Sequence, residues 1–291
     1  PSELDALARI AAPGRRRLCQ GKAAAGPSKG EHMAEERNLV HTVGKAERDR
    51  VILRGKDLCG ELIGYVTFSQ MTGLMLTGKM PDEKQARMID ALLVALVEHG
   101  MTSSAIAARL IYHTSPEALQ GAVAAAILSA GGRHLGTADL CAKMLQAALA
   151  PEKRQGRSID EVADEVVEQY LSTKTPIAGI GHPTHTGGDP RADRLFEVAR
   201  ETGVYGDACE LIQVISKKAS ARVGKNLPVN VTGAMGSIAT EMGLDWRLAK
   251  AFAIIGRALG ALAHLSDEVK NPIGRPIAQL VEHSVEYRDP E

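Results

Sequence analysis

The chain has 291 residues, and its 35 Lys and Arg residues balance its 35 Asp and Glu residues, so the formal net charge is zero. This balance argues against a nucleic-acid partner or a membrane-surface partner, since both usually require a basic excess or a basic face. Hydrophobic residues make up 44% of the chain, yet no apolar run reaches the roughly 20 residues of a membrane span. Ala, Leu, Ile and Met dominate this apolar content and favour packed helices.

Residues 1–44 differ in composition from the rest of the chain. Their stretch APGRRRLCQGKAAAGPSKGEH is rich in small and basic residues, and it lacks both apolar periodicity and the apolar core of a secretory signal. We expect a flexible tail, an extended gene start or an expression remnant, with a basic interaction arm as the weaker alternative.

Four cysteines are spread along the sequence, at Cys19, Cys59, Cys141 and Cys209, and none forms a C-x-x-C pair. This spacing favours neither a disulfide framework nor a zinc site, so no metal is expected. A reducing cytoplasm is the expected location.

From about residue 45 onward the sequence predicts helices. The first long helix spans residues 81–100, with an apolar stripe at helical spacing and Gly100 as its stop. In the next, over residues 115–132, Ser115 is the expected N-cap. A capping box then joins Ser158 to Glu161.

Three further helices are expected after residue 185. They begin at Asp189, Asp207 and Asp245, and the helix from Asp189 is expected to end at Gly203. The helix from Asp245 is apolar on most sides, which predicts a buried position. Because no alternating strand pattern separates these segments, we expect an all-α fold.

Residues 179–191 read GIGHPTHTGGDPR and allow several interpretations. A dinucleotide loop would require glycine where Thr184 stands, and no strand precedes it. A metal loop would use His182, His185 and Asp189, but Pro183 interrupts the helix on which paired histidine ligands usually lie.

An anion-binding loop is the third interpretation. Its glycines allow close approach of the backbone to a ligand, His182 offers a polarising N–H, and Arg191 lies in the first turn of a helix. The simplest alternative is that Gly and Pro only end one helix and begin the next. Composition alone slightly favours this simple alternative.

This segment resembles the G-x-G-H…DPR motif of the citrate synthase superfamily. Seven further segments resemble motifs of that superfamily in the same order, from about residue 45 to the end of the chain. They are VILRGKDLCGEL, LMLTGKMPDE, EHG, GGRHLGTADL, NVTGAMG, AIIGRALGALAHLSDE and NPIGRP. The chain is short for a citrate synthase, and in length and motifs it is more similar to citryl-CoA lyases, including the lyase module of ATP-citrate lyase.

The resemblance implies an all-helical enzyme that works as a homodimer or a dimer of dimers. Residues 45–135 and 237–291 would form a large helical domain, and residues 136–236 a small one. The ligand cleft would lie between them, and domain closure would exclude water.

The resemblance also implies roles for individual residues. Arg191, Arg257 and Arg275 would bind substrate carboxylates, with Arg275 reaching the site of the partner subunit. His99 would bind the same substrate, and His182 would contact its carbonyl or hydroxyl oxygen, accepting the hydroxyl proton during cleavage. His134 would hydrogen-bond the thioester enol, although the residues around it depart from the family pattern.

Thr232 stands where the family has a catalytic Asp, and threonine is no base near neutral pH. Gly179, Gly181 and Lys225 are expected to contact coenzyme A, although a solvated helix end explains Lys225 equally well. The expected ligands are an acyl-CoA and a di- or tricarboxylate.

The expected reaction is cleavage of citryl-CoA, or of a related 3-hydroxy-3-carboxyacyl-CoA, to acetyl-CoA and a 2-keto acid such as oxaloacetate. Loss of the general base would impair condensation of acetyl-CoA more than cleavage. Condensation of the citrate synthase type and a non-catalytic protein that binds CoA esters remain the alternatives.

Overall fold

The computed structural model describes residues 40–132 and 137–290 of the chain. Contacts divide the chain into Pro1–His41 and Thr42–Glu291, and the second unit contains all the elements described below. The tail expected at residues 1–44 therefore lies almost wholly outside the described residues.

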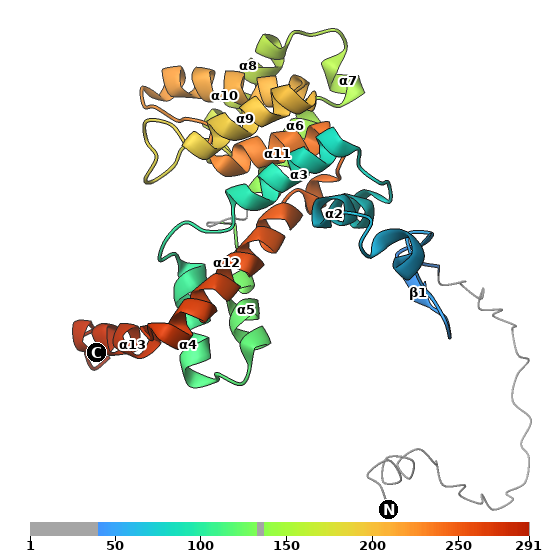
Figure 1. Ribbon diagram of the computed structural model, residues 1–291. Helices are drawn as coiled ribbons and strands as arrows, with labels where there is room; N and C mark the ends of the chain where they lie inside the picture. The colour runs from blue at the N-terminus through green and yellow to red at the C-terminus, as the bar shows by residue number, and fades with distance from the viewer. Residues whose placement is uncertain (1–39, 133–136, 291) are drawn as a thin grey trace, which may run out of the picture. The chain divides into compact units, whose positions relative to one another are not determined.

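Helices dominate this unit and confirm the all-α prediction (Figure 1). They are α2 (Phe68–Thr77), α3 (Glu83–Ala95), α4 (Ser103–Thr114), α5 (Leu119–Leu128), α6 (Ala138–Ala148), α7 (Pro151–Arg154), α8 (Ile159–Ser172), α9 (Pro190–Thr202), α10 (Asp207–Val223), α11 (Val231–Glu241), α12 (Ala251–Lys270) and α13 (Gly274–Ser284).

The expectation of helices from residue 45 is wrong for the first segment. Strands β1 (Gly44–Ala46), β2 (Val51–Leu53) and β3 (Lys56–Asp57) form a small antiparallel sheet in the order β1-β2-β3. Arg54 and Gly55 turn the chain between β2 and β3, with φ of 48° and 81°, as a two-residue hairpin requires. Strands of two or three residues are too short to produce a visible alternation.

Two of the expected helix starts are confirmed by their caps. Ser158 accepts a hydrogen bond from the backbone N–H of Glu161, and the Glu161 carboxylate accepts the backbone N–H of Ser158. Asp189 caps α9, which ends at Gly203 in the left-handed conformation. Both caps supply hydrogen-bond partners for backbone groups that would be unpaired at a helix end.

Three other boundaries were wrong. Helix α3 ends at Ala95, before Gly100, and α5 begins at Leu119, so Ser115 closes α4 rather than opening α5. Asp245 caps only a short 3₁₀ turn, η2 (Trp246–Leu248), and α12 begins at Ala251. The expected start at Asp207 is confirmed, since Asp207 is the first residue of α10, with Gly206 as its N-cap.

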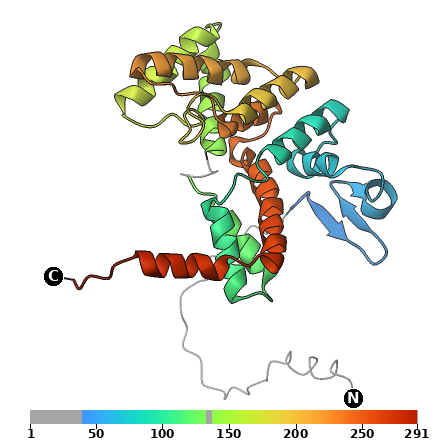
Figure 2. The ribbon, with the colours of Figure 1, turned by 60° about the vertical axis from the view of Figure 1, so that its left-hand side comes forward.

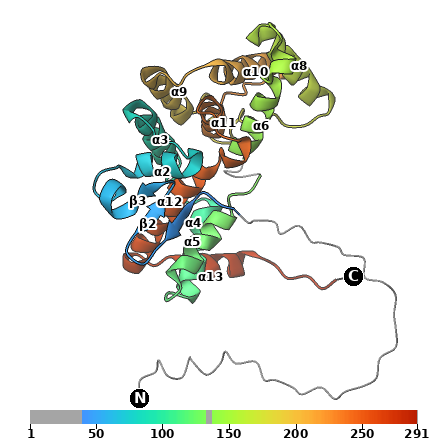
Figure 3. The same ribbon diagram turned by 90° about the vertical axis from the view of Figure 1, so that its right-hand side faces the viewer.

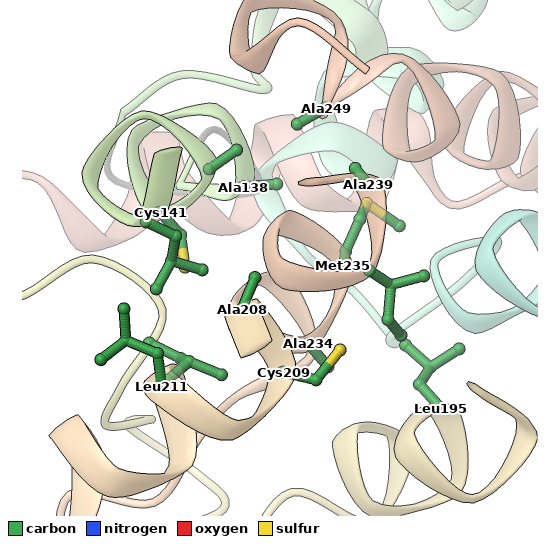
Figure 4. Packing of buried hydrophobic residues seen from close by; sticks show 14 of the residues in the cluster. Ala138, Cys141, Leu195, Ala208, Cys209, Leu211, Ala234, Met235, Ala239 and Ala249 are labelled. Carbon is green, nitrogen blue, oxygen red and sulfur yellow. The ribbon is translucent and has the colours of Figure 1, made fainter. Parts of the chain in front are cut away.

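Helix α11 is the centre of the larger hydrophobic core. All its residues from Val231 to Ala239 are buried, and α6, α9 and α10 pack around it (Figure 4). Its small residues permit this, since a Cβ at Gly236 would lie 2.6 Å from the carbonyl oxygen of Ala138. A second, smaller core joins α4, α5 and α12, which lie together in Figures 2 and 3.

Helix α12 contacts α3, α4 and α5, and it crosses α3 at very short range. A Cβ at Gly256 would lie 2.5 Å from the carbonyl oxygen of Leu93, and one at Gly260 only 1.8 Å from that of Val97. The two glycines therefore bring the end of α3 directly onto α12. The proposed division into a large and a small domain stays a prediction.

The stretch Trp246–Lys270 is long and apolar enough, by length and composition, to cross a membrane, contrary to the sequence-based expectation. This is weak support for a span, because the buried core helices of water-soluble proteins also meet the criterion. The expectation that α12 is buried holds for one side only, since Leu259, Leu262 and Val269 are exposed.

Candidate functional site

A cleft of about 940 Å³ lies between the loop at residues 175–184, the start of α11 and the facing end of α3. His99, His182, Arg191, Thr232 and Arg257 all line it. None of the described lining residues is Asp or Glu. A cleft of this volume with two arginines and no acid in its described wall suits an anionic ligand of substantial size.

The glycine loop is fixed against the start of α11. Gly179 has φ of 90°, and a Cβ there would lie 2.7 Å from Cα of Gly233. The carbonyl oxygen of Gly179 accepts the N–H of Asn230, and the Asn230 side chain donates to the carbonyl oxygen of Gly181. Both glycines line the cleft, and Gly179 is required there for packing and backbone conformation.

His182 has its ring position and its tautomer set by the backbone. Its Nδ1 lies 3.0 Å from the backbone nitrogens of both Thr184 and His185 and accepts their hydrogens. The neutral ring therefore carries its own hydrogen on Nε2. Burial and, to a lesser extent, His185 lower the pKa of His182.

His99, His182 and His185 form a cluster whose nitrogen atoms lie within 4.8 Å of one another. Nitrogens at such distances suit a transition metal, but the hydrogen on His182 Nε2 occupies the lone pair that a metal would need. Two arginines beside the cluster also disfavour a cation. These residues do not fit a three-histidine metal site.

Asp189 links the start of α9 to the start of α11. Its carboxylate accepts the Nε–H of Arg191 at 3.0 Å and an Nη2–H at 2.9 Å, and also the backbone N–H of Val231. Burial raises the pKa of Asp189, but these hydrogen bonds outweigh burial and lower it overall. With its oxygens so engaged, Asp189 is not available as the metal ligand that one interpretation required.

Arg257 is the most unusual charge in the cleft. It is only 2% exposed, and its Nε and Nη1 atoms find no hydrogen-bond partner among residues 40–132 and 137–290. The nearest acid is Glu98, whose Oε2 lies 3.7 Å from Nη1. Burial lowers the pKa of Arg257, and Glu98 offsets this in part. A buried guanidinium with unused donors is costly unless a ligand supplies the acceptor.

Glu98 is a residue that sequence reasoning missed. Its carboxylate accepts the backbone N–H of His99 and lies 2.9 Å from His264 Nε2. His264 Nδ1 in turn accepts a hydrogen bond from Arg109, which also pairs with Glu268. The sequence contained one signal for this network. Arg109 and Glu268 are charged residues at helical positions that face the core.

Glu268 extends this network to α13. It is 4% exposed, and its Oε1 accepts the N–H groups of Ile273 and Gly274 at the start of that helix. Buried ionic groups are tolerated only when hydrogen bonds satisfy them. The network therefore connects the cleft, through α12, to the helix that carries Arg275.

Thr232 is buried at the start of α11, with 7% of its surface exposed. Its hydroxyl donates to Asn230 Oδ1 at 2.7 Å, because that oxygen already accepts two backbone N–H groups. The Thr137 hydroxyl must then donate to Thr232. Thr232 is thus a satisfied hydroxyl in a one-way chain of donors, and it has no basic function.

The remaining predicted site residues lie elsewhere. Arg275 is exposed on α13 and does not line the cleft. Lys225 is exposed after α10, and Lys218 on α10 pairs with Asp160 and Asp164 on α8. His134 lies outside the described residues.

The fold and the cleft together define a mainly helical protein whose cleft is lined by two arginines and, among the described residues, by no acid. A family model described as "Citrate synthase, C-terminal domain" matches residues 23–277. The chain therefore belongs to the citrate synthase family, which is a family of enzymes.

Two lyase structures are similar to this chain. The structure of citryl-CoA lyase from Hydrogenobacter thermophilus is similar with a TM-score of 0.76 and 34% identity, over 88% of this chain and 96% of that one. An ATP citrate lyase of Methanosaeta concilii, in complex with (3S)-citryl-CoA, shares the fold at a TM-score of 0.69 and 18% identity, over 95% of this chain and 47% of that one.

Among curated proteins, citrate synthase 2 of Bacillus subtilis is 26% identical over 219 residues, which cover 74% of this chain and 54% of that protein. The chain thus spans about half the length of the curated relatives that it matches.

Proposed function

We propose that this protein cleaves citryl-CoA, or a closely related 3-hydroxy-3-carboxyacyl-CoA, to acetyl-CoA and a 2-keto acid such as oxaloacetate. The observation that carries the proposal is Arg257, a nearly fully buried guanidinium with unused donors in a cleft without a described acid. The similarity to citryl-CoA lyase of Hydrogenobacter thermophilus, over nearly all of both chains, supports the reaction class.

In this reaction the tertiary hydroxyl loses its proton and becomes the keto-acid carbonyl. The carbon–carbon bond breaks, its electron pair forms the thioester enolate, and a proton then adds to the carbon to give acetyl-CoA. We assign the substrate carboxylates to Arg191 and Arg257. The hydrogen on His182 Nε2 would stabilise the developing carbonyl, whereas accepting the hydroxyl proton would require the other tautomer.

The hydrogen-bonded state of Thr232 favours cleavage over condensation. Condensation must first remove a proton from the acetyl methyl group, and loss of a positioned base for this step costs roughly 10²–10⁴ in rate, or about 3–5 kcal/mol of barrier. Cleavage instead releases the proton of the tertiary hydroxyl to solvent and takes up a proton at the enolate carbon, and water can supply that second proton. The same observation makes a non-catalytic binder of CoA esters the second candidate.

We further propose that coenzyme A enters beside Gly179 and Gly181, which line the cleft, and that Lys225 meets its phosphates. Arg275 would complete the site of a partner subunit in a homodimer. Buried thiols at Cys141 and Cys209, whose pKa values burial raises to about 12 and about 11, are compatible with the proposed cytoplasmic location.

The test is incubation of the full chain with citryl-CoA, with acetyl-CoA and oxaloacetate measured over time. Arg257→Gln is expected to lower kcat/KM by about 100-fold, because charge-assisted hydrogen bonds contribute about 1.5–3 kcal/mol each. Arg257→Lys should recover only part of this, and the exposed Arg247→Gln should be unaffected.

No release from citryl-CoA by the wild type, together with calorimetric binding of CoA esters, would replace the lyase proposal with the non-catalytic binder. Equal activity of the wild type and Arg257→Gln would remove the assigned carboxylate site.

A further inference from the structure

His185 lies in the histidine cluster, although no family motif assigned it a role. Its Nε2 is 3.1 Å from Nε2 of His99, and its ring centroid is 4.6 Å from that of His182. A nitrogen–nitrogen distance of 3.1 Å is a hydrogen-bonding distance, so one of the two rings donates its hydrogen and the other accepts it. His185 and His99 therefore form an imidazole pair.

This pair is able to gain a proton without losing its contact. Two neutral rings carry two hydrogens, one of which lies between them and one on the outer nitrogen of the accepting ring. The outer nitrogen of the donating ring retains a free lone pair. A proton added there makes that ring cationic and turns the contact into a stronger, charge-assisted hydrogen bond.

His182 does not share this property. Its Nδ1 accepts two backbone N–H groups, and a proton on that nitrogen would break both hydrogen bonds. Its Nε2 already carries a hydrogen. Proton uptake in the cluster therefore belongs to the His99–His185 pair.

Among residues 40–132 and 137–290, the formal charges that face the pair cancel one another. Arg191 and Asp189 face it from α9, and Asp189 is already in a bidentate pair with Arg191. Arg257 faces it from α12, and Glu98 lies beside Arg257. Burial lowers the pKa of His99, and Arg191 lowers it further, so without a ligand the His99 ring is neutral at neutral pH.

We propose that His99 and His185 form a proton-accepting pair, and that binding of a dicarboxylate keto acid in the cleft is coupled to uptake of one proton by this pair. The identity of the ligand rests on the proposed function. Such a ligand places at least two negative charges beside balanced surroundings, and a nearby negative charge favours the protonated imidazole. The affinity should then rise as pH falls, by up to about tenfold per pH unit where a full proton is taken up.

Calorimetric titration of the full chain with oxaloacetate tests the coupling, at one pH in several buffers with different ionisation enthalpies. The dependence of the heat on the buffer gives the number of protons taken up. The wild type is expected to take up between about half and one proton per site. His185→Gln, which can hydrogen-bond His99 but cannot be protonated, should bind with less than half this uptake. The exposed His283→Gln is the matched control and should behave as the wild type does.

NMR titration of the histidine rings without ligand provides a readout that does not depend on binding. If His99 ionises at the same pH in the wild type and in His185→Gln, the pair does not exist and the proposal is wrong. Oxaloacetate binding without proton uptake, or with equal uptake in His185→Gln, overturns it as well. Stoichiometric Zn²⁺ binding that His185→Gln abolishes would show a metal site in its place.

The experiments distinguish a failure of the proposed pair from a failure of the proposed lyase reaction. A chain that takes up a proton with oxaloacetate but releases nothing from citryl-CoA would keep the pair and refute the lyase. A chain that cleaves citryl-CoA but binds oxaloacetate without proton uptake would keep the lyase proposal and refute the proton-accepting pair. If oxaloacetate does not bind at all, the assigned carboxylate site is wrong, and the NMR titration decides on the pair.

Discussion

At the scale of single residues, the hydrogen bonds of Thr232 show why its side chain does not act as a base. Asn230 Oδ1 accepts two backbone N–H groups and also the hydroxyl hydrogen of Thr232. The hydroxyl of Thr137 must therefore donate to Thr232. The hydroxyl of Thr232 therefore cannot accept a proton from the acetyl methyl group near neutral pH. Its place at the start of α11 would nevertheless favour a negative charge.

Thr232→Asp should therefore restore proton removal from the acetyl methyl group. We expect exchange of the methyl hydrogens of acetyl-CoA with deuterium from D₂O, measured by mass spectrometry with oxaloacetate present, to accelerate by about 10²-fold or more. Thr232→Asn is the matched neutral control. Exchange that is no faster in Thr232→Asp than in Thr232→Asn would contradict the assignment of this position.

The lowered pKa values of His99 and His182 predict how stability depends on pH. Below about pH 6.5, the unfolded chain protonates these histidines while the folded chain does not, so the unfolded state binds more protons. The free energy of unfolding should fall as pH decreases from about 7 to 5. In urea titrations followed by circular dichroism, His99→Gln should show a shallower fall, and an equal slope in both proteins would refute this origin.

At the scale of elements, the crossing of α3 and α12 brings together the two sides of the cleft. His99 and Glu98 follow α3, and Arg257 lies on α12 between Gly256 and Gly260. Because a side chain at either glycine would meet a backbone carbonyl of the segment that begins in α3, the short distance between the two helices depends on both.

Gly260→Ala should destabilise the fold by about 1–3 kcal/mol, because the new methyl group has no free space. The matched control is Gly121→Ala in α5, where the nearest neighbour of a Cβ is 3.7 Å away. This change should stabilise by about 0.5–1 kcal/mol, since alanine is the better helix former. Urea unfolding measures both, and equal effects at the two glycines would contradict the close crossing.

At the scale of the whole molecule, several large apolar side chains remain exposed on α12 and α13. Leu259, Leu262 and Val269 on α12 and Leu280 and Val281 on α13 are between 42% and 68% exposed. Large exposed apolar side chains on two consecutive helices are typical of a protein interface. It lies on the helix that carries Arg275, as the proposed homodimer requires.

Leu280→Asp should therefore shift the protein from dimer to monomer in size-exclusion chromatography with light scattering. A buried charge at an interface is costly because no partner compensates it. Val223→Asp, an equally drastic change at the end of α10, should leave the mass unchanged. A monomeric wild type, or a Leu280→Asp protein that stays dimeric, would refute this interface.

Local sequence patterns predicted the features that depend on neighbouring residues. The capping box at Ser158, the cap at Asp189 and the αL end at Gly203 each involve groups a few residues apart, so the sequence contains all the information. The sheet at residues 44–57 was missed because its strands are too short for periodicity. The start of α5 was misplaced because Ser115 serves the preceding helix.

The sequence by itself determined the helical class, the family and the residue types available for chemistry, because these follow from composition, periodicity and ordered motifs. Only the tertiary structure decided which charges meet. His264 joins Arg109 and Glu98 in one network although it lies 155 residues after Arg109, and His185, set aside on sequence grounds, contacts His99. Such contacts depend on the α3–α12 crossing and on the turn at residues 182–185. Both bring together residues whose spacing along the chain does not predict their distance in space.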